Sequence, residues 1–151
     1  MPLNFGQNMF GDSKVYEGSA KRQFVHNISG LFFFLDISTD VIFRYPGYSR
    51  VYSITNGSTK LFSSFVLPDN ALINSANVEG SASMLNRTYT IYRMASATST
   101  ANTICSANCH TSSIANPLYA EVDNDNYIYC VEIDSIQVND YVYAAKILYT
   151  I

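Results

Sequence analysis

Short runs of apolar residues, many of them alternating with polar ones, fill the chain from Phe24 to its end. About ten such runs follow one another at a spacing of roughly 8 to 14 residues, with turn-forming residues between them, which is typical of a β-sandwich or barrel. Helical i, i+3, i+4 spacing of apolar residues is not sustained anywhere, and the abundant Tyr, Phe, Val, Ile and Thr favour pleated surfaces. The pattern therefore predicts an all-β fold.

The last two runs are the richest in tyrosine. In 127–133 the odd positions, which include Tyr127 and Tyr129, are apolar, and Glu132 marks the other face as the wetter one. In 141–149 the odd positions again carry tyrosines, including Tyr141 and Tyr143, and the even positions carry Lys146. We expect the odd residues of both strands to be buried.

The connection between these two runs predicts their pairing. A five-residue loop, 135–139, would place Asp134 opposite Asp140 and put both tyrosine rows on the same side of one hairpin. The second run has no charge except Lys146, so we expect it in the interior of a sheet rather than at an exposed edge.

The first residues follow no such pattern. Residues 1–24 hold glycines, polar residues and isolated aromatic side chains without a sustained period. We expect an extended N-terminal arm over 1–24, which becomes ordered where it lies on other protein, and a single β-sandwich domain over 25–151.

Two polar segments predict tight turns. Pro68 has no N–H for a sheet ladder, and Asp69 and Asn70 after it suit a turn. The segment VDNDN at 122–126 has carboxylate and amide side chains that can hydrogen-bond their own backbone. Calcium binding is an alternative for these oxygen-rich side chains, but the segment lacks the glycine and the distant glutamate of an EF-hand loop, so a structural turn is favoured.

Composition narrows the functional classes. Only 14% of the 151 residues are charged and 48% are apolar, which favours a protein whose faces contact other protein. The net charge is −3 and the only adjacent basic pair is Lys21-Arg22, so we expect no nucleic-acid binding. The longest apolar run, LFFFL at 31–35, is too short to span a membrane, and the first residues do not have the pattern of a secretory signal.

Four segments, taken in order, resemble a module of bacteriophage structural proteins and large bacterial surface proteins. They are FVLPDNALI at 65–73, YTIYR at 89–93, VDNDNYIYCVEI at 122–133 and YAAKILYTI at 143–151. The resemblance covers about residues 61–151; Asn70 stands where the pattern often has Gly, and Ala144-Ala145 replaces a more usual Gly-containing entry to the last strand. It implies a jelly-roll-like sandwich of about 8–10 strands, often trimeric through the sheet that bears the last strand, without enzymatic activity.

Cysteine and histidine residues raise alternatives. Cys105, Cys109 and His110, with Cys130, could hold zinc, although only one correctly spaced ligand pair exists. A Cys105–Cys109 disulfide is a second alternative, and free thiols in or near a loop are favoured over both.

Catalytic motifs do not occur. The two histidines, His26 and His110, lie in no recognisable motif, and Glu121, Asp123 and Asp125 are more consistent with solvated turn carboxylates than with a glycosidase pair. We therefore expect neither enzymatic activity nor a cofactor.

The sequence thus favours a virion structural protein, made in the host cytoplasm, that acts as a minor capsid, decoration, spike or fibre component of a bacteriophage. We expect a homo-oligomer, with a trimer favoured, that contacts other capsid or virion proteins and has a host surface glycan as a further candidate partner. A carbohydrate-binding or adhesion module on a phage or bacterial surface is the alternative. The aromatic residues expected at interfaces are Phe5, Phe10, Tyr16, Tyr127, Tyr129, Tyr141 and Tyr143.

Overall fold

The computed structural model describes residues 21–35, 42–45, 50–53 and 59–151, and strands make up most of these residues. The strands are β1 Gln23–Ser29, β2 Phe34–Leu35, β3 Ile42–Tyr45, β4 Arg50–Ser53, β5 Thr59–Phe65, β6 Leu72–Gly80, β7 Thr88–Ala95, β8 Ala101–Asn108, β9 Ser113–Ile114, β10 Tyr127–Ile136 and β11 Tyr141–Thr150. Within the described ranges, two short 3-10 helices, η1 Gly30–Phe32 and η3 Ala82–Asn86, lie between strands. No helix in these ranges is long and apolar enough to cross a membrane.

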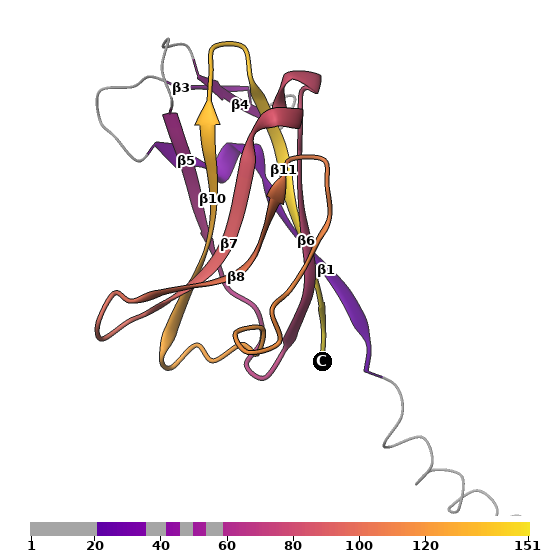
Figure 1. The fold of residues 1–151 in the computed structure, drawn as a ribbon, viewed down its shortest axis with the longest axis vertical. Helices are drawn as coiled ribbons and strands as arrows, with labels where there is room; N and C mark the ends of the chain where they lie inside the picture. The colour runs from indigo at the N-terminus through magenta and orange to yellow at the C-terminus, as the bar shows by residue number, and fades with distance from the viewer. Residues whose placement is uncertain (1–20, 36–41, 46–49, 54–58) are drawn as a thin grey trace, which may run out of the picture.

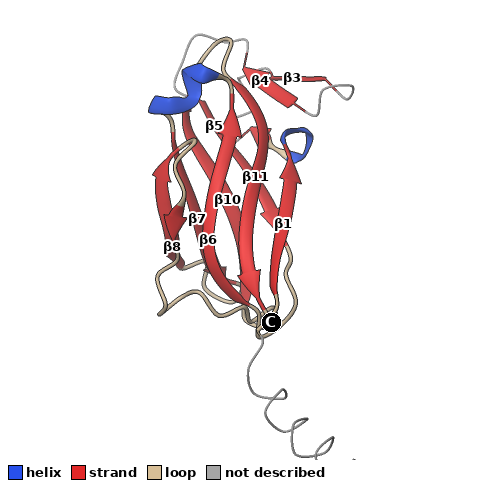
Figure 2. Ribbon diagram, turned by 90° about the vertical axis from the view of Figure 1, so that its right-hand side faces the viewer, coloured by secondary structure: helices blue, strands red, loops and turns tan. Residues whose placement is uncertain are grey.

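The strands form two antiparallel sheets that pack face to face (Figures 1 and 2). The six-stranded sheet has the order β3-β4-β11-β6-β9, and β1 also pairs with β11. The five-stranded sheet has the order β2-β5-β10-β7-β8. The predicted antiparallel β-sandwich is confirmed. The eleven strands found in the described ranges slightly exceed the 8–10 expected, and two of them, β2 and β9, have only two residues.

The connectivity is that of a jelly roll. Four antiparallel pairs are nested along the chain: β7 with β8 innermost, then β6 with β9, then β5 with β10, and β1 with β11 outermost. Pairs nested in this way over two sheets produce the double Greek key of a jelly roll. The additional β3–β4 pair lies at the end of the sandwich where β10 ends and β11 begins (Figure 1).

The core lies between the sheets and is lined by alternate residues of each long strand. Tyr129, Val131 and Ile133 of β10 are at most 1% exposed, as the alternation predicts. From the opposite sheet, Ala145 and Ile147 of β11 are completely buried. The last strand is central, as expected, because β11 lies between β6 on one side and β1 with β4 on the other.

The predicted hairpin between the last two strands is wrong. β10 pairs with β5 and β7, whereas β11 belongs to the other sheet. Both strands bury their odd positions, but they do so from opposite sides of the core. Alternation shows which face of a strand is buried, and two facing strands satisfy it as well as two paired ones.

The alternation also fails near the start of β11. The register shifts there: Val142 lies opposite Gly80, and Ala144 lies opposite the adjacent Glu79. The extra residue, Tyr143, is 39% exposed, while Val142 is fully buried. This β-bulge turns the Tyr143 side chain outward, away from the buried face on which the alternation predicts it.

The N-terminal boundary of the sandwich lies slightly earlier than predicted. Gln23 and Phe24, assigned to the arm, belong to β1 and pair with Thr150 and Tyr149. The Phe24 ring stacks on the Tyr149 ring at a centroid distance of 5.5 Å. Phe5, Phe10 and Tyr16, expected at an interface, lie outside the described residues.

Candidate functional site

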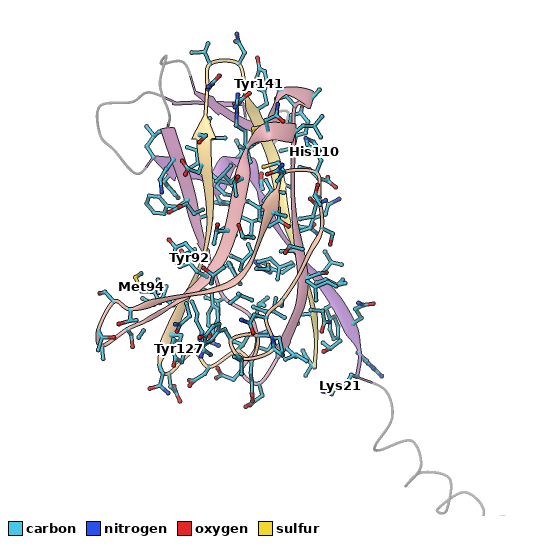
Figure 3. All side chains as sticks on the ribbon, viewed as in Figure 1. Lys21, Tyr92, Met94, His110, Tyr127 and Tyr141 are labelled. Carbon is cyan, nitrogen blue, oxygen red and sulfur yellow. The ribbon has the colours of Figure 1, made fainter. Side chains whose placement is uncertain are left out.

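A polar pocket of about 480 Å³ opens at the loop end of the sandwich where β5 ends and β10 begins. Tyr127 marks this end in Figure 3, and Tyr141 and His110 lie toward the other end. The lining residues come from the loop after β5, from β7, and from the segment that leads into β10: Asp69, Asn70, Arg93, Glu121, Val122, Asp123, Asp125 and Tyr127.

The loop after β5 forms the predicted turn. Ala71 N donates to Pro68 O at 3.1 Å, and Asn70 has a φ of 63°, in the left-handed region. Asparagine tolerates this conformation better than most residues other than glycine, so Asn70 suits this turn position. The turn directs residues 69 and 70 to the pocket.

A backbone ladder fixes the facing segment. Asn70 N donates to Val122 O at 2.9 Å, and Val122 N donates to Ala71 O at 2.8 Å. Ala71 and Val122 are buried. Side chains alternate between the two faces of this extended segment, so Glu121, next to Val122, is exposed at the pocket. The two loops are therefore joined through their main chains.

The VDNDN segment is the tight turn that the sequence predicts. Asp123 Oδ1 accepts from Asn126 N at 3.2 Å, and Asp123 Oδ2 accepts from Asn126 Nδ2 at 2.8 Å. These hydrogen bonds, together with the nearby charge of Arg93, lower the pKa of Asp123. Asn124 N donates to Asp69 Oδ1 at 2.9 Å, which ties this turn to the loop after β5.

Arg93 is held between two aromatic rings. Its guanidinium carbon lies 4.1 Å from the ring centroid of Tyr127 and 5.0 Å from that of Tyr119. Cation–π attraction of this kind orients the planar guanidinium without a carboxylate partner. Its Nε is buried and has no hydrogen-bond partner among the described residues. Tyr129 supports the same region from the core, since its hydroxyl accepts from Asp123 N at 2.7 Å.

The pocket is strongly acidic. Four carboxylates and one guanidinium line it, a net charge of −3 if all are ionised. Within the described ranges, no group of three or more His, Cys, Asp or Glu side chains is arranged to hold a metal ion. The carboxylates are thus spread around the pocket instead of converging on one point.

The sequence pattern predicts solvated turn carboxylates at 121–125 and no binding site. In the structure, Glu121, Asp123 and Asp125 line one pocket. Arg93 cannot be predicted from the local sequence, because a lone arginine in a strand gives no sign of the two rings that hold it. A general acid for glycoside cleavage needs a raised pKa, whereas the pKa of Asp123 is lowered.

The tyrosines expected at an interface have different environments. Tyr129 is 1% exposed in the core of its own chain, so its assignment to a subunit interface is wrong. Tyr127 is half-buried against Arg93 and Tyr141 is half-buried. Tyr143 is exposed because of the β-bulge.

The three cysteines are free and buried. Cys105 lies in β8 and Cys130 in β10, so these thiols belong to strands rather than to loops. Burial raises the pKa of Cys105 to about 11 and that of Cys109 to about 12. The thiolate needed for nucleophilic chemistry is therefore strongly disfavoured.

The outer faces of the two sheets differ in polarity. On the five-stranded sheet, Ile128 lies opposite Met94, and Met94 lies opposite Ala101. Phe65 of β5 pairs with Tyr129, so Val66, one residue beyond the end of β5, lies opposite Ile128. Val66 is 73% exposed and Ile128 is 48% exposed. We call Val66, Ile128, Met94 and Ala101 the apolar row. Figure 3 shows Met94 and Tyr92 along this side.

The six-stranded sheet presents a more polar outer face. Lys146 lies opposite Asn27 on one side and opposite Asn77 on the other. Its Nζ forms a 2.9 Å ion pair with Glu79 Oε1. Exposed apolar residues also occur on this face, among them Val25, which is 52% exposed, and Ile114, which is 85% exposed.

Comparison of the sequence with models of protein families gives no match, and comparison with curated protein sequences also gives none. Functional assignment therefore depends on the surfaces and the pocket described above.

Proposed function

We propose that the protein is a non-enzymatic structural component of a bacteriophage virion, such as a minor capsid, decoration, spike or fibre protein, and that it acts by self-assembly. The apolar row is the observation that carries this proposal. A soluble protein rarely leaves apolar side chains side by side across four strands of a sheet unless another protein covers them. The jelly-roll connectivity is compatible with this role, but a fold alone does not specify one.

We propose that a second copy of the chain packs on the apolar row. The row carries no charge, and neighbouring Tyr92 and Cys130 on the same face extend its low polarity. Every subunit of a symmetric oligomer carries the same apolar row. In a dimer the row can pack on its own copy, and in a trimer the three rows can meet around the threefold axis. The trimer implied by the sequence resemblance would use the sheet that bears β11, whereas the apolar row lies on the other sheet.

Light scattering coupled to size-exclusion chromatography tests the proposal. The wild-type chain should elute as a homo-oligomer, a trimer in the favoured case, and the double variant Val66→Lys/Ile128→Lys should elute as a folded monomer. Val25→Lys is the matched control, because Val25 is 52% exposed on the outer face of the other sheet. A monomeric wild type, or dissociation by Val25→Lys alone, would overturn the proposed interface.

A further inference from the structure

We propose that the acidic pocket at the loop end of the sandwich binds an uncharged glycan. This function is separate from self-assembly, because the pocket and the apolar row have no residue in common. The volume of about 480 Å³ lies within the range of roughly 300–1,000 Å³ typical of small-ligand sites.

Unused hydrogen-bonding groups line the pocket. In the described structure, the carboxylates of Glu121 and Asp125 accept no hydrogen bond and form no ion pair, and the side-chain amide of Asn70 is also without a partner. Arg93 adds a guanidinium held by rings rather than by a carboxylate. The pocket therefore offers acceptors and donors together.

This mixture matches sugar hydroxyls. A hydroxyl group both donates and accepts, so adjacent hydroxyls on a sugar ring can donate to Glu121 or Asp125 and accept from Arg93 or Asn70. A cationic ligand such as a lysine side chain fits less well, because its ammonium group can only donate hydrogen bonds. It would leave the donors of Arg93 and Asn70 without acceptors, and its charge would lie close to the Arg93 guanidinium. Hydrogen bonds to ionised groups are stronger than neutral ones, which favours this set of side chains for a polyol.

The charge of the pocket selects against anionic ligands. With a net charge of −3, the lining repels sialic acids, uronic acids, sulfated sugars and nucleic-acid phosphates. Arg93 does not make the pocket attractive to anions. Four carboxylates surround this one guanidinium, and its positive charge interacts with the carboxylate of Asp123. Uncharged glycans that contain hexoses fit both the hydrogen-bonding groups of the pocket and its negative electrostatic potential.

Three of the lining side chains are held in place before any ligand binds. Asp69 accepts from the main chain of Asn124, Asp123 from Asn126, and Arg93 is fixed between Tyr119 and Tyr127. Side chains that are already ordered lose little entropy on binding, so Arg93 can donate to a sugar hydroxyl at a small entropic cost.

The test uses the full chain on a printed array of neutral, sialylated and sulfated glycans, followed by titration of the best glycan into ¹⁵N-labelled protein monitored by NMR. Neutral glycans should bind, with shift changes centred on residues 69–70 and 121–127. The variants Glu121→Gln and Asp125→Asn should each weaken binding by about threefold to tenfold, because each removes one charged acceptor. The double variant should weaken it more than tenfold.

Glu79→Gln is the control, because it also removes one carboxylate charge but Glu79 lies at the other end of β6, outside the pocket, so binding should be unchanged. Three results would overturn the proposal: no neutral glycan binds, a sialylated glycan or a trilysine peptide binds the pocket in its place, or binding is unchanged in the double variant. The outcome does not depend on whether the protein is an oligomer.

Discussion

Arg87 Nε donates a 2.6 Å hydrogen bond to Asp140 Oδ2, and this ion pair connects the residue after η3 with the last residue before β11. The Asp140 side chain is 2% exposed and that of Arg87 is 16% exposed. Asp140 Oδ2 also accepts from Gln137 N at 2.8 Å, so one carboxylate shapes the connection between the two sheets. Removing one member of a buried pair leaves the other charge uncompensated.

The first prediction follows from this pair. Asp140→Asn should lower the free energy of unfolding at pH 7 by about 3 kcal/mol, as measured by urea denaturation. Glu79→Gln, which breaks the exposed Lys146–Glu79 pair, should change it by less than about 1 kcal/mol. Equal effects of the two substitutions would show that the Arg87–Asp140 pair is not buried in solution.

The pH dependence of stability gives a second prediction. Burial alone would raise the pKa of Asp140, but hydrogen bonds from Arg87, Ser83 and Gln137 outweigh it and lower the pKa below its ordinary value of 3.8. A lowered folded-state pKa contributes stability that is complete above the unfolded value and is lost as the pH falls through the folded value. Unfolding free energy should therefore decrease below about pH 4, and Asp140→Asn should show a smaller decrease than the wild type. An equally steep decrease in the variant would contradict this.

Tyr89 provides a third prediction. Its buried hydroxyl lies 2.6 Å from Ala76 O and 2.8 Å from Thr111 O, and thereby links β7 to the facing sheet. Tyr89→Phe should destabilise the protein by about 1–3 kcal/mol, because buried carbonyl oxygens lose their donor. Tyr143→Phe is the control, since Tyr143 is exposed, and it should have almost no effect on thermal denaturation.

Gly80 provides a fourth prediction through the close approach of β6 and β11. A Cβ at this position would collide with the backbone oxygen of Tyr141 and would lie 2.8 Å from Met84 Cγ. Gly80→Ala should lower the unfolding free energy by about 1–3 kcal/mol in urea denaturation. A neutral result would mean that the strands separate at the β-bulge more easily than their register suggests.

The cysteines provide a fifth prediction. Cys105 and Cys109 are buried, and burial raises the pKa of both thiols, so the reactive thiolates are scarce in the folded protein. A chromogenic disulfide reagent at pH 8 should react slowly with the native chain and rapidly with all three thiols in denaturant. Immediate reaction of the native protein would show that these strands open readily.

Local residues were enough to predict much of the fold. Alternation in 127–133 indicated the buried face of β10, and Pro68 with Asn70 indicated the turn that ends the preceding strand segment. The near absence of charge in the final run indicated a central strand, and β11 has that position. Each of these predictions depends on the chemistry of a few consecutive residues.

The candidate site was only partly predictable. The three carboxylates of 121–125 stand together in the sequence, but Asp69 and Arg93 reach the same pocket from other parts of the chain. Arg93 is recognisable as a site residue only because Tyr119 and Tyr127 enclose it, and these contacts require the folded jelly roll.

The amino-acid sequence by itself determined that this chain forms strands, where several of them turn, and which face of each is apolar, because side-chain alternation and turn chemistry are local. Only the tertiary structure decided that β10 and β11 lie in opposite sheets, that Tyr143 is turned outward, and that Arg93 joins the acidic pocket. An apolar face can be buried equally well beside a neighbouring strand or across the core, so the choice between them depends on the packing of the whole chain.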